Sequence, residues 1–260
     1  QAGVTSASVG IFAWTALEPE EGRYEFAWLD RVMDRFAQEG MFVFLATPSG
    51  SKPMWLSEKY PEVRRVNKDG RRDASGWRHN HCMSSPVYRA KTAQINRSLA
   101  ERYKAHPALA LWHVGNEYSG ECHCELCRTA FQDWLKQRYG SLNALNSAWW
   151  SSFWNHTITD WRQIQTADPS IDALQLDWMR FVNDQHVSFM LNEMIPLREL
   201  TPDVPCMTNF MGTHESTNYW QWAEHVDIIA NDLYPMPADC ADSWRYSIQS
   251  DFIHSLMRGM

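Results

Sequence analysis

The chain has 260 residues, with 24 Lys and Arg against 31 Asp and Glu, a formal net charge of −7 and an isoelectric point near 5.8. This acidic balance argues against nucleic acid and anionic membranes as partners, because both attract basic proteins. Hydrophobic residues make up 44% and charged residues 21%, as in ordinary globular proteins. We find neither an apolar run long enough to span a bilayer nor a signal peptide at the start.

Five apolar runs of strand length alternate with helical patterns along the chain. The runs lie at 4–14, 41–47, 108–114, 204–210 and 226–232. They are almost continuously apolar, which is typical of parallel strands covered on both faces. Helices are predicted over 26–40, 86–106, 126–140, 172–200, 216–224 and 241–258, and long loops over 48–85 and 140–171. The alternation predicts right-handed βαβ units.

Five such strands fit either an open doubly wound sheet or part of a (β/α)8 barrel. No Gly-rich phosphate loop follows any of the runs, which weakens the nucleotide-binding version of the doubly wound sheet. Polar residues follow the ends of several strands instead, and this is where barrel enzymes place their sites. We therefore predict an α/β fold of the (β/α)8 TIM-barrel class.

The run at 108–114 ends in the sequence HVGNEY, which places Asn116 and Glu117 at the carboxyl end of a buried strand. Aromatic neighbours such as Trp112 and Tyr118 would desolvate the carboxyl group, as a general acid at neutral pH requires. The alternative is a surface glutamate in an ordinary βα loop. Asn116 could bind a substrate hydroxyl.

Three cysteines lie within six residues, and a fourth precedes them in the sequence HNHC. These are Cys122, Cys124, Cys127 and Cys82. Four thiolates can surround one zinc ion as a closed structural site, and disulfides between such close neighbours would be strained. A redox pair of Cys124 and Cys127 is the alternative, but it leaves Cys122 without a role. Cys206 and Cys240 are predicted to be ordinary buried thiols.

Other polar residues follow strand ends or precede the first cysteine. A partner carboxylate for Glu117 could come from Asp232, which ends its strand, or from Glu215, which lies further into its loop. A buried structural role for Asp232 is equally compatible with the sequence. The remaining polar candidates are Asn209, Tyr234, Arg71, Arg72, Arg78, His79 and His81.

Several ordered stretches resemble the glycoside hydrolase family 42 β-galactosidases. They are VGIFAWTALEPEEGRYEFAWLD, LATPSGSKPMWLSEKYPEV, RHNHCMSSPVYR, WHVGNEY, CHCELC, FQDWLKQRYGSLNALNSAWW and TNFMG. The resemblance implies a (β/α)8 barrel that hydrolyses terminal β-D-galactosides with retention of configuration. It also implies a structural zinc ion and a homotrimer. Thiolate ligation and the lack of a signal sequence suggest a cytoplasmic location.

The resemblance assigns roles to single residues. It makes Glu117 the catalytic acid/base and Asn116 and Arg78 substrate-binding residues. Trp154 and Tyr234 would line the sugar site. The zinc ligands would be Cys82, Cys122, Cys124 and Cys127. Two departures from the family pattern are Ser8, where some members have Arg, and Trp150, where the family usually has Gly.

The catalytic nucleophile of the family is a second glutamate, which we expect a short way past Met260. Residues 1–260 would then be a partial catalytic domain with about strands two to six, without the later domains of the family, and inactive by itself. The alternatives are a related barrel glycosidase acting on β-glucosides or α-L-arabinopyranosides, and a noncatalytic sugar-binding module.

Overall fold

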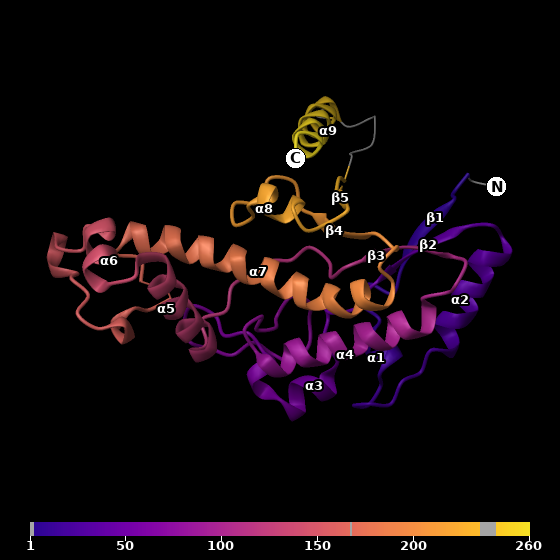
Figure 1. Cartoon of the computed structure of the whole chain (residues 1–260), viewed down its shortest axis with the longest axis horizontal. Coiled ribbons are helices and arrows are strands. Elements are labelled where there is room, and N and C mark those ends of the chain that lie inside the picture. Colours follow the sequence, from indigo (N-terminus) through magenta and orange to yellow (C-terminus); the bar gives the residue numbers. More distant parts are fainter. Residues whose placement is uncertain (1–2, 167, 235–242) are drawn as a thin grey trace.

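The computed structural model describes residues 3–166, 168–234 and 243–260. Within them the strands form one five-stranded sheet in the order β1-β2-β3-β4-β5, with every neighbouring pair parallel (Figure 1). The strands are β1 (Ser6–Val9), β2 (Phe42–Ala46), β3 (Leu109–His113), β4 (Cys206–Phe210) and β5 (Ile228–Asn231). Each crossover advances by one strand in the same direction, as in a β/α barrel, whereas a doubly wound sheet reverses direction. The predicted class is confirmed over the alternative.

In the described residues six helices occur where the sequence predicts them, and three further helices were not predicted. They are α1 (Trp14–Leu17), α2 (Ala27–Gln38), α3 (Met54–Lys59), α4 (Pro86–Tyr103), α5 (Glu125–Tyr139), α6 (Leu142–Trp149), α7 (Asp172–Leu200), α8 (Tyr219–Ala223) and α9 (Ser243–Arg258). Short 3-10 turns cover Pro61–Val63, Phe153–Asn155 and Trp161–Gln163. The prediction missed α1, which follows the first strand, and α3 and α6, which lie inside the long loops. The predicted start of the last helix, residues 241–242, lies outside the described residues.

The first predicted strand was too long, because a glycine ends it. Gly10 has a φ of +87°, a left-handed conformation that interrupts an extended strand. The backbone N–H of Ala13 then donates to the Gly10 carbonyl at 3.1 Å, and α1 follows at once. The apolar residues beyond Val9 therefore belong to a turn and a helix.

The expected helix boundaries are confirmed. Gly40 and Gly140 follow α2 and α5 with φ values of +65° and +72°, as glycines beyond a helix end commonly do. At the start of α4, the Ser85 hydroxyl accepts the Tyr88 N–H at 3.3 Å and Pro86 takes the first helical position.

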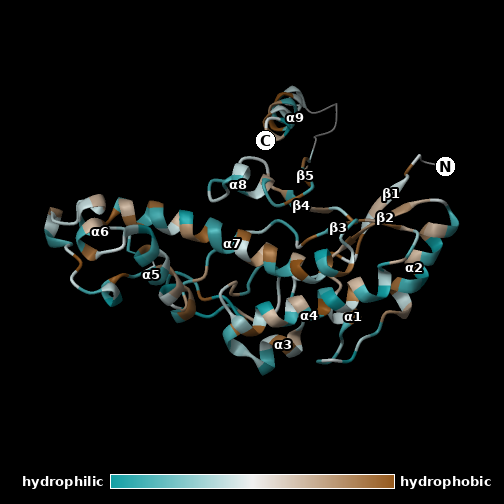
Figure 2. Ribbon diagram, in the orientation of Figure 1, coloured by the Kyte–Doolittle hydropathy of each residue, from teal (hydrophilic) through white to brown (hydrophobic). Residues whose placement is uncertain are grey.

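Two buried clusters make up the core. The larger packs the strands against α2, α4 and the second half of α7, while the smaller joins α5, α6 and the first half of α7 to the cysteines. Helix α7 has 29 residues and runs along α4 (Figure 1), so it belongs to both clusters. In Figure 2 the ribbon of α7 alternates between brown and teal, as expected for a helix with one buried face. The sheet is thereby tied to the segment that carries the cysteines.

Candidate active site

The site lies at the carboxyl ends of β3, β4 and β5, where the side-chain amide of Asn209 connects three segments. Asn209 Oδ1 accepts the backbone N–H of Glu117 at 3.1 Å and lies 3.0 Å from Nε2 of His113. Asn209 Nδ2 donates to Asn116 Oδ1 at 3.2 Å and to Asp232 Oδ2 at 2.8 Å. One buried amide therefore fixes the loop after β3 and the residue after β5 relative to β4.

The backbone around Glu117, in the loop after β3, is left-handed at two positions. Glu117 has a φ of +47°, which is uncommon for a residue other than glycine and indicates local strain. The bond from its N–H to Asn209 helps to maintain this conformation. Gly115 has a φ of +61°, and a Cβ atom there would lie 2.3 Å from Cζ of Tyr118. The turn that presents Glu117 thus requires glycine at this position.

The buried Glu117 carboxylate has two side-chain donors. Arg78 Nη1 donates to Oε2 at 2.9 Å and Asn116 Nδ2 donates to the same oxygen at 3.2 Å. The Arg78 guanidinium also lies over the Phe12 ring, 5.8 Å from its centroid, and about half of its side chain is exposed. Three residues that the sequence singled out, Arg78, Asn116 and Glu117, therefore lie in contact.

Asp232 and Tyr234 share a hollow of about 260 Å³ with Glu117. Burial and the neighbouring Glu117 carboxyl raise the pKa of Asp232 to about 6, against the lowering effect of Asn209 and Arg78. The negative charges of Asp232 and Glu117 also raise the pKa of the exposed Tyr234 phenol. Asp232 thus lines the same hollow as Glu117, at the sheet edge where its strand-end position placed it.

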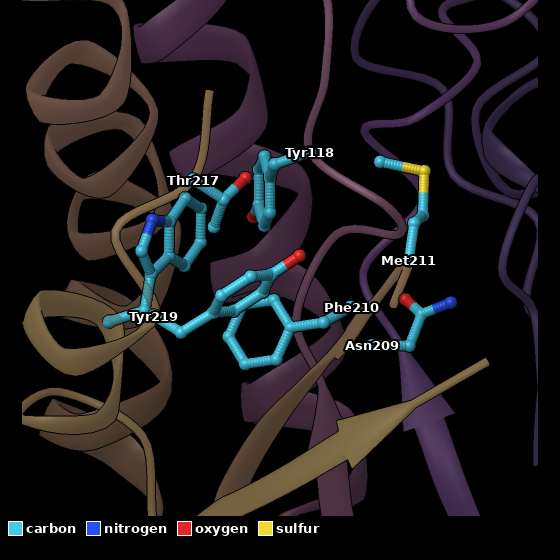
Figure 3. Close-up of a pocket in the computed structure, with 7 residues that line it drawn as sticks. Tyr118, Asn209, Phe210, Met211, Thr217 and Tyr219 are labelled. Atoms are coloured by element: carbon cyan, nitrogen blue, oxygen red, sulfur yellow. The ribbon is translucent and has the colours of Figure 1, made fainter. Parts of the chain in front are cut away.

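A group of aromatic rings lies beside the carboxyl end of β4 (Figure 3). The Phe210 ring meets Tyr219 and Trp222 edge-on at centroid distances of 4.9 and 5.7 Å, and Trp222 lies 5.4 Å from Tyr118. Figure 3 shows Asn209 beside this group of rings. Asn209 itself is buried, and burial strengthens the hydrogen bonds that its amide makes.

Sequence reasoning missed a buried carboxylate beneath the loop, Glu193 of α7. It is fully buried, accepts hydrogen bonds from Thr47 Oγ1 at 3.1 Å and from the Tyr118 hydroxyl, and burial raises its pKa. Thr47 in turn accepts the Gly115 N–H at 2.6 Å. A signal was present, because Glu193 falls at helical spacing from the buried residues Met190 and Leu197.

The four predicted metal-binding cysteines converge. Their sulfur atoms all lie within 4.8 Å of one another and are buried. Cys82 Sγ is 3.5 Å from the sulfurs of Cys124 and Cys127, which are 3.8 Å apart. A tetrahedral Zn²⁺ with bonds of about 2.3 Å would place its sulfur ligands about 3.8 Å apart. Backbone N–H of Val66 donates to Cys122 Sγ at 3.4 Å. The cluster could bind a metal ion.

Two other candidates, Trp154 and Glu215, do not line the hollow that contains Glu117. Trp154 is 76% exposed and stacks on Phe153, which stacks on Trp150. Figure 1 places this turn, beside α6, at the end of the molecule away from β3. Glu215 is exposed in the loop after β4. Cys206 is buried in β4, as predicted, whereas Cys240 lies outside the described residues.

Comparison with known proteins identifies the family. The glycoside hydrolase family 42 model, described as β-galactosidase, matches residues 1–260. The chain belongs to glycoside hydrolase family 42. Among its relatives, β-galactosidase BglY of Alicyclobacillus acidocaldarius is 55% identical over 88% of this chain and 34% of its own length. β-Galactosidase GanA of Bacillus subtilis is 51% identical over 97% of this chain and 39% of its own length.

Solved family 42 structures agree with the fold. The β-galactosidase from Rahnella sp. R3 superposes with a TM-score of 0.94 at 50% identity, covering 98% of this chain and 38% of that one. The family assignment and the (β/α)8 class are thus confirmed together. The chain spans between one third and two fifths of the length of these relatives. None of the helices in the described residues is both long and apolar enough to cross a bilayer.

The close approach of Gly115 to Tyr118 gives a stability prediction. In the complete gene product, Gly115→Ala should lower the free energy of unfolding by about 2 kcal/mol or more, because the methyl group meets the ring and φ is left-handed. Gly76→Ala is the matched control, since a Cβ at Gly76 meets nothing within 4 Å, and it should change stability by less than about 0.5 kcal/mol. Denaturant unfolding of both variants measures the difference; equal midpoints would contradict it.

Proposed function

We propose that this chain carries the acid/base half of a retaining β-galactosidase that hydrolyses terminal β-D-galactosides. The observation that supports this most strongly is the Glu117 carboxyl, buried at the carboxyl edge of a barrel sheet between an amide and a guanidinium. The relatives named above are β-galactosidases, which indicates the sugar.

In the first step, protonated Glu117 gives its proton to the glycosidic oxygen as the bond to the leaving group breaks. In the second step, the Glu117 carboxylate takes a proton from the water that attacks the covalent galactosyl intermediate. Asn116 and Arg78 bind sugar hydroxyls. Arg78 is suited to this because only one of its five N–H donors is needed for Glu117 and half of the side chain is exposed.

The nucleophile must be a second carboxylate. In a retaining glycosidase the two carboxyl groups are about 5–5.5 Å apart, which leaves room for the anomeric carbon between them. The Asp232 carboxyl accepts the Asn209 side-chain N–H at 2.8 Å and is held at the end of β5. We assign the nucleophile to a glutamate past Met260, as the family resemblance implies. The isolated 260-residue chain is accordingly expected to be inactive or nearly so.

Replacing Glu117 in the complete gene product tests the proposal. Glu117→Gln should lower kcat/KM for an alkyl β-galactoside by about 10²–10⁴-fold, because its leaving group needs protonation. With a dinitrophenyl galactoside, whose leaving group needs no proton, the rate of the first step should fall less in this variant. Azide added to Glu117→Ala should yield β-galactosyl azide, since this anion attacks without a general base.

Exposed Glu215 provides the control, and Glu215→Gln should retain wild-type rates. An unchanged rate in Glu117→Gln would remove Glu117 from the mechanism. A wild-type protein that prefers aryl β-glucosides or α-L-arabinopyranosides would favour the related glycosidase. One that binds galactose without hydrolysing any of these substrates would favour the noncatalytic module.

We propose further that the four cysteines bind a structural Zn²⁺. A site with four thiolate ligands has no open position for water or substrate, so the ion would stabilise the loops and take no part in hydrolysis. Gln185 of α7 donates to Cys127 Sγ at 3.7 Å, as a neighbour that orients a ligand would. Because free thiols persist in a reducing compartment, the cluster also supports a cytoplasmic location.

Metal analysis of the complete gene product should find one zinc ion per chain. Cys127→Ser should lose the ion and lower the melting temperature by several degrees, because it removes one of four ligands. Cys206→Ser is the matched control: it replaces another buried thiol, outside the cluster, and should retain the ion. Purified protein without zinc, or a Cys127→Ser variant that retains it, would contradict the assignment.

The turn that carries Trp154 follows α6 and lies at the end of the molecule away from β3 (Figure 1). Trp154 can therefore line a sugar site only if that site belongs to a neighbouring copy. We therefore propose that it acts across an interface in a homotrimer. Sedimentation of the complete gene product should give three copies, and Trp154→Ala should raise KM while leaving the sheet intact. Phe12→Ala would serve as a same-chain comparison, since Phe12 contacts Arg78. A monomer with wild-type KM in Trp154→Ala would contradict this.

A further inference from the structure

One carboxyl group of α7 accepts a hydrogen bond at each of its two oxygens. Glu193 is fully buried, and its Oε1 accepts the Thr47 hydroxyl at 3.1 Å while its Oε2 accepts the Tyr118 hydroxyl. Its backbone is fixed as well, because the side-chain amide of Asn96 in α4 donates to the Glu193 carbonyl at 3.2 Å. Burying a carboxyl group costs free energy, which an apolar residue at this position would avoid. Its presence therefore calls for a reason other than packing.

The hydrogen bonds of Glu193 form a closed ring with the turn that carries Glu117. The Thr47 oxygen accepts the backbone N–H of Gly115 at 2.6 Å, and the single hydrogen of the Thr47 hydroxyl is donated to Glu193. Tyr118 donates to the other carboxyl oxygen. The residues at 115 and 118, one before and one after Glu117, are thereby attached to the same side chain.

The turn needs these attachments because its backbone is strained. Glu117 has a φ of +47°, and a residue other than glycine keeps such a conformation only where the surrounding contacts hold it there. The bond from the Glu117 N–H to Asn209 supplies one contact, from β4. The bonds to Glu193 add contacts from α7 and from Thr47, which directly follows β2. Loosening them would release the turn, and the Glu117 carboxyl would move with it.

We propose that Glu193 is a positioning residue, which holds the Glu117 carboxyl at the leaving-group oxygen of the substrate through Thr47 and Tyr118. This inference rests on the proposed function of Glu117. Because Glu193 is fully buried, it cannot touch the substrate, so it acts only through the placement of Glu117. Proton transfer requires hydrogen-bonding distance, and a displacement of about 1 Å can cost about 10²-fold in rate.

The test compares two substrates in the complete gene product carrying Glu193→Gln. The amide has nearly the size of the carboxyl group but replaces one acceptor with an N–H donor, so the Thr47 and Tyr118 hydroxyls cannot both donate to it. For an alkyl β-galactoside, whose leaving group needs a proton, kcat/KM should fall by about 10- to 100-fold. For a dinitrophenyl galactoside, which needs no proton, kcat/KM should stay within about twofold of the wild type. Equal falls with both substrates, or no fall with either, would overturn the proposal.

Tyr118→Phe tests the same ring from its other side. This change removes only the hydroxyl that donates to Glu193 and retains the ring that packs on Trp222. It should show the same selective loss with the alkyl galactoside. If this variant keeps wild-type kcat/KM for both substrates, the ring does not hold Glu117, and the proposal is wrong.

Asp177→Asn is the matched control, since Asp177 is also a buried carboxyl of α7. It accepts the Tyr139 hydroxyl at 2.6 Å and Trp149 Nε1 at 2.9 Å, in the core cluster that contains α5 and α6. Its replacement should lower stability and leave the ratio of the two kcat/KM values unchanged. A change in this ratio as large as in Glu193→Gln would overturn the proposal, because a general loosening of α7 would then explain both.

Backbone hydrogen exchange gives a readout that does not depend on activity. The Gly115 amide should exchange faster in Glu193→Gln than in the wild type, because its acceptor Thr47 loses a fixed partner, and in Asp177→Asn it should exchange at the wild-type rate. An unchanged rate in Glu193→Gln would contradict the proposal. If the wild-type protein hydrolyses no galactoside, the proposed function of Glu117 fails, and the exchange rates still decide whether Glu193 holds the turn.

Discussion

The site depends on the hydrogen bonds of one buried side-chain amide, that of Asn209. It has two acceptor lone pairs and two donors, and contacts to Glu117, His113, Asn116 and Asp232 use all of them. Parallel strands bring their carboxyl ends to one edge of the sheet, but a strand end alone does not fix a loop. The amide does this for the loop after β3, whose acidic residue has a left-handed backbone. Its burial excludes water that would compete for these bonds.

The cysteine cluster and the Glu117 carboxyl are parts of one assembly. Arg78 lies four residues before Cys82, in a segment fixed by backbone bonds from His79 N–H to Gly50 O and from Cys82 N–H to Val63 O, both 2.8 Å. Because Cys82 lies in a cluster with the cysteines of the next loop, the position of the Arg78 backbone is restricted. From this position the Arg78 guanidinium donates to Glu117. A structural ion would thus influence catalysis indirectly, through the placement of a guanidinium. Helix α7 supports both parts, with Gln185 at the cluster and Glu193 under the loop that carries Glu117.

Much of this could be predicted from the sequence, because continuous apolar runs, glycine helix ends and closely spaced thiols are local signals. The strand order, the cysteine cluster and the proximity of Arg78, Asn116 and Glu117 follow from such signals and the family resemblance. The extent of β1 could not be predicted in this way, because the conformation of Gly10 depends on the turn that follows it. Glu193 was missed since its partners, Thr47 and Tyr118, come from segments distant in sequence. The exposed position of Trp154 likewise depends on how the loop after α6 folds.

The central claim is that Glu117 is the acid/base of a retaining site whose nucleophile is neither Glu117 nor its neighbour Asp232. Trapping the galactosyl intermediate with a 2-deoxy-2-fluorogalactoside and mapping the modified peptide of the complete gene product tests it most directly. The account predicts one adduct per chain, on a glutamate outside residues 1–260. An adduct on Asp232 would contradict the assignment of the nucleophile, and an adduct on Glu117 would show that the acid/base assignment is wrong.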